Sequence, residues 1–205
     1  MEIKRVKMKR LYLLLLLFLP VTLFSQSQNQ NIDFTILHSI NSPQVQPSDG
    51  FYRFVSNSDM YVITGVPVTM AIIGLAGGDN ELLRNAGVIA TGTIINLGIT
   101  AGLKYLVKRK RPFITYKGII VNKSNSPCLD PSFPSGHTST SFMLATSLSF
   151  AYPKWYVIAP VYLYAGTVAY SRMDLGVHYP TDIVWGMIIG SGTAYNIYKI
   201  NKRIK

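Results

Sequence analysis

Five apolar stretches without an internal Lys, Arg, Asp or Glu constrain the fold of this chain more than any other feature of its sequence. They cover residues 60–78, 85–103, 138–152, 155–171 and 183–198. Each stretch is long enough for a helix, and the sequence has no internal repeat and no alternating strand pattern. Their Gly, Ser and Thr residues suit close helix packing in a membrane, and would equally suit the buried helices of a soluble bundle. The pattern predicts an all-α helical bundle with about five transmembrane helices.

The N-terminal residues have the layout of a secretory signal sequence. A basic stretch is followed by an apolar run over residues 11–24, and Ser25 then precedes a segment rich in Gln, Ser and Asn. The run is shorter than the roughly 20 residues that cross a bilayer, which favours cleavage near Ser25 over a retained signal anchor. We therefore expect a signal sequence at residues 1–25, an extracytoplasmic lead-in with little core of its own at 26–59, and one helical domain at 60–205.

The positive charge of the chain, +11 overall, is concentrated in three clusters. Of the 20 Lys and Arg residues, five lie in the first ten positions, four in the last seven, and five between Lys104 and Arg111. The two end clusters are typical of membrane-orientation signals. No RNP-type, zinc-finger or recognition-helix pattern accompanies the basic residues, so nucleic acid is not an expected partner.

The positive-inside rule orients the predicted helices. With the lead-in outside and each apolar stretch crossing once, the C-terminus lies inside, where Lys199, Lys202 and Arg203 are favoured. The same topology places residues 104–137 and 171–182 together on the outer side. We therefore expect functional residues in these two segments to face the periplasm from a bacterial inner membrane.

Lys104 and Arg111 are the first residues that indicate a phosphate site. Seven positions separate them, nearly two helical turns, so we expect both cations to project from one side of a helix end that Pro112 stops. Two neighbouring cations repel each other unless an anion lies between them, and the planar guanidinium suits phosphate oxygens. A basic membrane flank is the alternative, but the topology puts this cluster on the side where flanking positive charge is disfavoured.

The sequence Phe133-Pro134-Ser135-Gly136-His137 comes directly before the third apolar stretch and predicts a tight turn that opens a helix. The backbone N–H groups of Ser135, Gly136 and His137 would form an anion site at this helix start. Gly136 would let the backbone approach the anion closely. His137 would stand beside the anion as a proton donor to a leaving oxygen.

A third group of residues lies between the last two apolar stretches. Arg172 supplies a further phosphate ligand. His178 and Asp182 are four residues apart around a helix start marked by Pro180, so the carboxylate can accept the imidazole N–H. That hydrogen bond would fix the tautomer and leave the other ring nitrogen free to attack phosphorus. We expect the nearby Asp174 to face solvent.

Metal and disulfide chemistry have little support in the sequence. The single cysteine, Cys128, cannot form an intramolecular disulfide or a cysteine-based metal site. The chain also lacks a His, Asp and Glu cluster with metal-ligand spacing, which disfavours two-metal phosphatase chemistry. We therefore expect no metal and no other cofactor.

Three motifs, complete and in order, carry a resemblance to a known family. They are Lys104-x6-Arg111-Pro112, Pro134-Ser135-Gly136-His137 and Ser171-Arg172-x5-His178-x3-Asp182. Together they resemble the signature of the type 2 phosphatidic acid phosphatase (PAP2) and vanadium haloperoxidase superfamily. The resemblance covers about residues 104–182, and a signature of three separate parts is highly specific.

The resemblance implies an all-helical core and a two-step hydrolysis of a phosphate ester. His178 would attack the phosphoryl group to give a phosphohistidine, with Asp182 orienting it. His137 would protonate the leaving alkoxide and later activate water. The groups expected to hold the phosphoryl oxygens are Lys104, Arg111, Arg172 and the backbone around Ser135 and Gly136.

The motifs leave the substrate and the membrane attachment open. An integral membrane phosphatase would act on a phosphorylated lipid such as phosphatidic acid, phosphatidylglycerol phosphate, an isoprenyl diphosphate or a lipid A phosphate. A soluble periplasmic acid phosphatase of broad specificity is the alternative. A haloperoxidase or a membrane binding protein with a decayed site has less support, because the Lys, Arg, His and Asp set is intact and no halide or peroxide pocket is recognisable. We expect the lead-in and the loop at residues 113–132 to set the specificity.

Overall fold

The computed structural model describes residues 32–41, 43–44 and 46–204, and every regular element in this part of the chain is a helix. The helices are α2 (Ile32–Ile40), α3 (Asp49–Gly77), α4 (Asn80–Val107), α5 (Pro112–Thr115), α6 (Gly136–Ala151), α7 (Trp155–Asp174) and α8 (Pro180–Ile204). The all-α prediction is therefore confirmed, and the five long helices correspond to the five apolar stretches. The predicted signal sequence at residues 1–25 lies outside the described residues.

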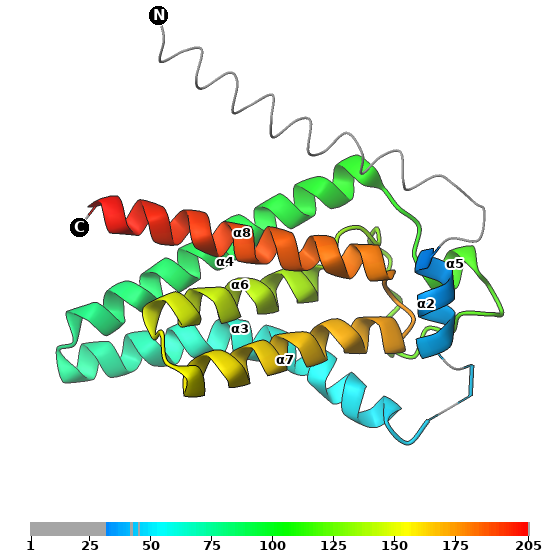
Figure 1. Ribbon diagram of the computed structural model, residues 1–205, viewed down its shortest axis with the longest axis horizontal. Helices are drawn as coiled ribbons and strands as arrows, with labels where there is room; N and C mark the ends of the chain where they lie inside the picture. Colours follow the sequence, from blue (N-terminus) through cyan, green and yellow to red (C-terminus); the bar gives the residue numbers. More distant parts are fainter. Residues whose placement is uncertain (1–31, 42, 45, 205) are drawn as a thin grey trace, which may run out of the picture.

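The long helices run side by side and alternate in direction along the length of the molecule (Figure 1). α2, α5, the start of α6 and the connection from α7 to α8 lie at one end of the bundle. The α3–α4 turn, the α6–α7 connection and the end of α8 lie at the other. Residues 104–137 and 171–182 thus lie at the same end of the bundle as residues 32–41. We call this end of the bundle the site end.

Local sequence explains where several helices begin and end. Gly78 takes a left-handed conformation after α3, with φ 67°. Asp79 then caps α4, because its carboxylate accepts the backbone N–H groups of Glu81 and Leu82, each at 2.9 Å. Pro180 occupies the first turn of α8, where its missing N–H has no cost.

α6 lies at the centre of the bundle and packs against α3, α4, α7 and α8. Its contact with α8 is close because Gly186 and Gly190 face it: a Cβ atom at Gly190 would lie 2.1 Å from the carbonyl oxygen of Ser139. Small residues four positions apart allow two helix backbones to approach in this way. The contact holds the start of α6 beside the start of α8, where two of the three motifs lie.

Hydroxyl side chains of α6 bind polar groups of α3 and α4 inside the bundle. Thr140 and Ser141 donate hydrogen bonds to the Asp59 carboxylate on α3, at 3.0 and 2.5 Å. Ser139 donates to the side-chain carbonyl of Asn96 on α4, at 2.8 Å. An unpaired buried polar group costs about 1–3 kcal/mol, so these bonds favour one register of the three helices over shifted ones.

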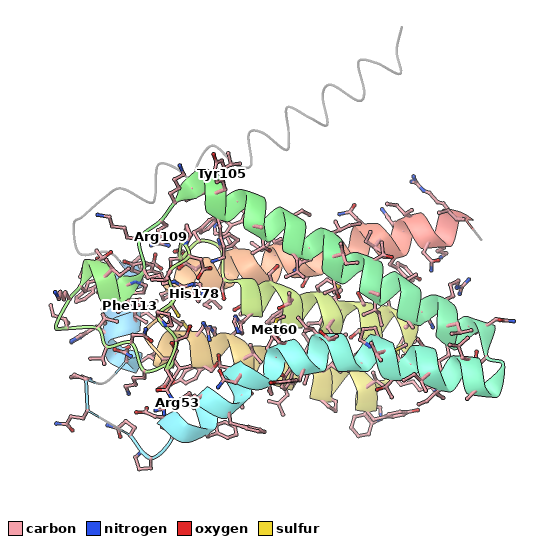
Figure 2. The ribbon with its side chains drawn as sticks, turned by 180° about the vertical axis from the view of Figure 1, so that it is seen from behind. Arg53, Met60, Tyr105, Arg109, Phe113 and His178 are labelled. Atoms are coloured by element: carbon pink, nitrogen blue, oxygen red, sulfur yellow. The ribbon has the colours of Figure 1, made fainter. Side chains whose placement is uncertain are left out.

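α3 and α4 present apolar side chains on their outer faces. The segments Asp49–Gly77 and Asn80–Thr115 are long and apolar enough to cross a membrane, judged by length and composition. Exposed side chains on them include Phe54, Tyr61, Ile72, Leu75, Ile94 and Leu106. Figure 2 shows Tyr105 pointing outward from the last turn of α4. These faces support the association of the protein with a membrane.

The segment before the bundle has more structure than its composition predicts. The sequence suggests a lead-in with little core at residues 26–59, but α2 lies in this range and α3 already begins at Asp49. Leu37 of α2 is fully buried and packs with Ile120 and Tyr179. These contacts join residues far apart in the chain, so they leave no local periodicity in the sequence.

Candidate active site

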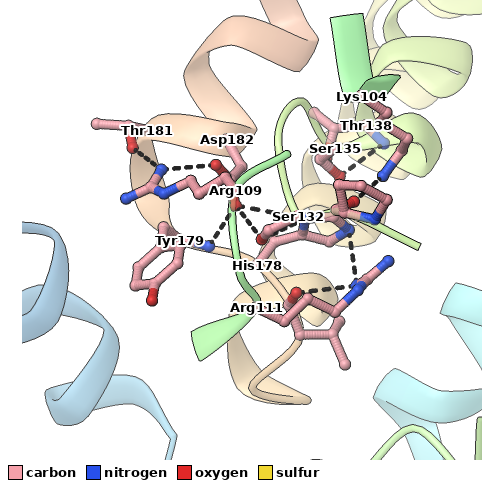
Figure 3. A network of polar contacts seen from close by, with 12 residues as sticks. Lys104, Arg109, Arg111, Ser132, Ser135, Thr138, His178, Tyr179, Thr181 and Asp182 are labelled. Carbon is pink, nitrogen blue, oxygen red and sulfur yellow. Dashed lines mark hydrogen bonds and ion pairs between the residues drawn. The ribbon is translucent and has the colours of Figure 1, made fainter. Parts of the chain in front are cut away.

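The imidazole of His178 and the carboxylate of Asp182 lie together at the site end. His178 Nδ1 is 3.5 Å from Asp182 Oδ2, and both side chains are buried. The same carboxylate oxygen accepts hydrogen bonds from the Ser132 hydroxyl (2.5 Å) and from the Tyr179 backbone N–H (3.0 Å). Figure 3 shows these groups converging on Asp182 in the first turn of α8. Because Nδ1 faces the carboxylate, Nε2 is the ring nitrogen directed away from it.

The second oxygen of Asp182 is bound by Arg109. Arg109 Nη1 lies 2.7 Å from Asp182 Oδ1, and Arg109 Nη2 lies 2.8 Å from Asp33 on α2. The guanidinium also stacks on the ring of Tyr179, at 3.8 Å from its centroid. Figures 2 and 3 show Arg109 beside His178 at the site end. Asp182 is therefore held on both sides, which fixes its orientation towards the imidazole.

The surroundings of His178 favour a neutral imidazole. Burial lowers its pKa, and the neighbouring guanidinium groups of Arg111 and Arg172 lower it further, whereas Asp182 raises it. The net effect is a pKa below the ordinary value. Nε2 of His178 lies 3.4 Å from Arg111 Nη1. An uncharged ring whose Nδ1 carries the proton beside a carboxylate has its lone pair on Nε2, as a nucleophile needs, and this lone pair accepts the N–H of Arg111.

Lys104 and Arg111 meet at one point, but not in the way that their spacing predicts. α4 ends at Val107, and Lys108 has a φ of 52°, so the two cations do not lie on one helix. Instead, Lys104 Nζ lies 2.8 Å from Asp130 Oδ2, and Arg111 Nη2 lies 2.7 Å from Asp130 Oδ1. The chain turns after α4 and brings the two cations together around the Asp130 carboxylate.

Arg111 is the most firmly fixed of the cations. Its Nε donates to the backbone carbonyl of Asp130, and its Nη1 donates to that of Val177, both at 2.9 Å.

Burial raises the pKa of Asp130, but Lys104 and Arg111 outweigh this effect and lower the pKa to about 2. The Asp130 carboxylate is therefore charged at neutral pH.

A cavity of about 240 Å³ lies between these groups. Six of the eight predicted site residues line it: Lys104, Arg111, Gly136, His137, Arg172 and His178. The other two, Ser135 and Asp182, are buried behind the wall. The structure thus gathers three cations and two histidines around one space large enough for a phosphoryl group.

Arg172 and His137 complete the wall. Arg172 Nη1 donates a hydrogen bond to Ser56 on α3, while its buried Nε has no hydrogen-bond partner among the described residues. A buried donor of this kind suits an anionic ligand. His137 is half-buried at the start of α6. Burial, followed by the positive charge of Arg172, lowers the pKa of His137 well below its ordinary value.

Ser135 caps α6 rather than lining the cavity. Its hydroxyl accepts the N–H of Thr138 (3.4 Å), and its own N–H donates to the backbone carbonyl of Asp182 (3.1 Å). The backbone amide of Ser135, predicted as a phosphate ligand, is therefore already bonded. Gly136 is the residue of this turn whose backbone reaches the cavity wall.

The expectation that Asp174 faces solvent is wrong. Its side chain is buried, close to the ion pair between Lys123 and Asp49 (2.9 Å). The Asn41 side chain donates to the backbone carbonyl of Asp174, at 2.6 Å. α2, α3, α7 and the loop before α6 meet here, and such long-range packing is invisible in a sequence pattern.

Three residues of the site belong to none of the predicted motifs. They are Arg109, which binds Asp182, Ser132, which donates to the same carboxylate, and Asp130, which bridges two cations. Arg109 is hidden among five basic residues, and the other two lie in a loop without periodicity. The available signal is their position, since Arg109 lies in the spacer of the first motif and the other two lie a few residues before the second.

Comparisons with known proteins agree with the motifs. The family model of the PAP2 superfamily matches residues 85–205, a range that contains all three motifs. The chain is 28% identical to an undecaprenyl-diphosphatase of Sulfolobus acidocaldarius over 189 residues, covering 90% of this chain and 87% of that protein.

Two solved structures share the fold. LpxE of Aquifex aeolicus superposes with a TM-score of 0.71 at 23% identity, covering 84% of this chain and 98% of that one. A transmembrane PAP2-type phosphatidylglycerolphosphate phosphatase of Bacillus subtilis superposes with a TM-score of 0.70 at 20% identity, covering 94% and 96%. The helical core is therefore common to all three, and the family match extends over more than half of the sequence. The chain belongs to the PAP2 superfamily.

Proposed function

We propose that this protein is a phosphohydrolase that removes a terminal phosphate from a membrane lipid through a nucleophilic His178. The observation that carries the proposal is the orientation of that ring. Its Nδ1 faces Asp182, while Nε2 lies beside Arg111 in a cavity that Lys104 and Arg172 also line. A nucleophile next to anion-binding cations is the arrangement that phosphoryl transfer needs.

The proposed reaction has two steps. In the first, Nε2 of His178 forms a bond to phosphorus as the bond to the leaving oxygen breaks, and His137 gives that oxygen a proton. In the second, His137 takes a proton from water, which attacks phosphorus and releases His178 and inorganic phosphate. The negative charge of a bound phosphoryl group would raise the lowered pKa of His137 and so favour its protonated form.

Lys104, Arg111 and Arg172 are proposed to hold the phosphoryl oxygens while charge moves towards the leaving group. The free Nε of Arg172 supports this role, because this guanidinium is buried in the cavity wall. The amide of Gly136, in the first turn of α6, would add a backbone donor at a helix start. Ser135 would act through the helix cap rather than by touching the substrate.

Lipid substrates are supported by the outer surface of the bundle and by the relatives. The undecaprenyl-diphosphatase acts on a lipid diphosphate, as its name states, and the phosphatase of Bacillus subtilis is described as transmembrane. Exposed apolar side chains on α3 and α4 would lie among lipid tails, and the cavity lies at one end of these helices, where a headgroup could reach it. These faces favour the lipid phosphatase over the soluble acid phosphatase.

The orientation in the membrane follows from the charges at the opposite end. Lys199, Lys202 and Arg203 lie on the last turns of α8, away from the cavity. The positive-inside rule places them in the cytoplasm, so we propose that the site faces the periplasm from the inner membrane.

The loop predicted to set specificity adjoins the cavity, since its residues Ser124, Cys128 and Asp130 lie in the cavity wall.

The test is phosphate release by the purified protein and by its His178→Ala variant, in detergent with EDTA. The substrates are phosphatidic acid, an isoprenyl diphosphate and a soluble aryl phosphate. We expect the variant to lose at least about 10³-fold in kcat, as when a covalent nucleophile is removed. The matched control is His38→Ala, because His38 is an exposed histidine of α2 outside the cavity. Equal activity of the His178 variant and the wild type would refute the nucleophile.

A further inference from the structure

Asp130 occupies the place between the two cations where a phosphate group is expected. Its two carboxylate oxygens bind Lys104 and Arg111 separately, at 2.8 and 2.7 Å. All three residues line the cavity that also contains His178. The carboxylate thus imitates two oxygens of a phosphoryl group, and it comes from the protein itself.

The donors that Asp130 uses are not free for a substrate. Lys104 Nζ binds Asp130 Oδ2 and also donates to the backbone carbonyl of Pro131. Arg111 Nη2 donates to the Asp130 carboxylate, and Nε donates to the backbone carbonyl of the same residue. Nη1 donates to the carbonyl of Val177 and lies 3.4 Å from Nε2 of His178. A phosphoryl group that occupies the position between the two cations must therefore take over the bonds that the carboxylate now makes there.

Asp130 is also the partner best placed to leave. Its side chain is 55% exposed, against 15% for Lys104 and 4% for Arg111. It lies in the irregular segment 116–135 between α5 and α6, next to the 91% exposed Leu129. On leaving, the carboxylate would be hydrated by solvent, whereas the two cations are fixed by α4 and by backbone carbonyls.

We propose that Asp130 is an internal competitor for the phosphate position, which binds Lys104 and Arg111 in the free enzyme and is displaced when a phosphoryl group enters. This inference deepens the proposed function and rests on it. Only enzyme molecules in which Asp130 has left the two cations can bind phosphate at this position. Because these molecules are a fraction of the population, the apparent affinity for every phosphate ligand is lowered by the same factor. The consequence is easier release of the product, inorganic phosphate.

The test is the binding of inorganic phosphate and of dimethyl phosphate to the detergent-purified protein by isothermal titration calorimetry. At about pH 8 the first ligand is mostly doubly charged, and the second carries one charge. We expect Asp130→Asn to bind both ligands more tightly, by about fivefold each, the scale of a half-exposed ion pair. The matched control, Glu81→Gln, removes one exposed negative charge at the other end of the bundle and should change neither affinity.

The two ligands separate displacement from other roles of Asp130. If the carboxylate stayed in place and only repelled anions, its removal would favour the doubly charged ligand more, and unequal factors would overturn the proposal. Weaker binding in Asp130→Asn would also overturn it, because it would make Asp130 a positioning residue for the cations. Thermal melting of each variant shows whether its substitution disturbs folding. If Asp130→Asn is destabilised, the same binding measurements are made on Asp130→Ala.

The binding measurement does not depend on turnover. Loss of activity in His178→Ala with no tighter phosphate binding in Asp130→Asn would sustain the proposed function and refute the competitor. If Asp130→Asn bound both ligands more tightly by the same factor while His178→Ala kept its activity, the competitor would be sustained and the proposed nucleophile refuted.

Discussion

Asp182 connects the proposed nucleophile to an ion pair that reaches helix α2. One carboxylate oxygen faces His178, and the other binds Arg109, which in turn binds Asp33. Thr181 donates to the same Asp33 carboxylate, at 2.5 Å. The orientation of the His178 ring therefore depends on Arg109, far from it in the sequence, and on α2, a helix that carries no motif.

Arg109 is predicted to be a positioning residue for this pair. In Arg109→Ala, the buried carboxylates of Asp182 and Asp33 lose their cation, so we expect the free energy of unfolding to fall by about 3 kcal/mol. We also expect kcat to fall more than KM rises, because Arg109 does not line the cavity. Chemical denaturation and steady-state kinetics measure the two effects. Lys110→Ala, which removes an exposed neighbouring charge, is the control, and equal behaviour of the two variants would contradict the prediction.

The protonation of His178 makes stability depend on pH. Its pKa is lowered, first by burial, from 6.5 to about 3, so between these values the unfolded chain binds a proton that the folded protein does not. This contribution to the free energy of unfolding is complete above about pH 6.5 and is lost as the pH falls towards 3. We expect the melting temperature to fall over this range, and less steeply in His178→Asn. Parallel curves for the two proteins would show that another group is responsible.

At the scale of the helices, the contact between α6 and α8 fixes the geometry of the site. The two helices start side by side, and Ser135, before α6, donates its N–H to the carbonyl of Asp182 in α8. Gly186 and Gly190 allow this approach, since a Cβ at Gly186 would lie 2.9 Å from the carbonyl oxygen of Ser135. A change in the spacing of these helices therefore moves the second motif relative to the third.

Gly190 tests this dependence. A methyl group at Gly190→Ala would meet the backbone of Ser139 and force the helices apart, at a cost of about 1–3 kcal/mol. Gly192→Ala, on the same helix, meets no atom within 4 Å and should be neutral or gain up to about 1 kcal/mol of helix propensity. Thermal melting in detergent compares the two variants. A Gly190 variant as stable as the Gly192 variant would mean that the helices adjust without strain.

At the scale of the whole molecule, the sequence predicts the bundle and the gathering of its motifs better than it predicts their details. Apolar stretches locate five helices, and their alternation brings the segments around His137 and His178 to one end. The prediction that Lys104 and Arg111 project from one helix is wrong, because the left-handed turn at Lys108 leaves no signal in their spacing. The burial of Asp174 and the role of Arg109 depend on tertiary contacts alone.

Single cysteines introduced into a Cys128→Ser background test the predicted membrane topology. Lys117→Cys places an exposed thiol at the site end, and Glu81→Cys places one at the opposite end. In spheroplasts, a membrane-impermeant maleimide should label the first variant and should label the second only after permeabilisation. The reverse pattern would put the site in the cytoplasm, and labelling of both without permeabilisation would argue against a spanning bundle.

The irregular segment 116–135 bears on how such an enzyme can diversify. It supplies Ser124, Cys128 and Asp130 to the wall of the cavity, whereas the helices that pack against the central helix α6 are α3, α4, α7 and α8. Substitutions and length changes in the part of this segment before Asp130 can therefore reshape the wall. Asp130, Ser132 and Ser135 would still hold the two cations, Asp182 and the start of α6. One phosphorylated lipid can then be exchanged for another without a change in the reacting residues, and the sequence differences between two such enzymes would lie mainly in this part of the loop.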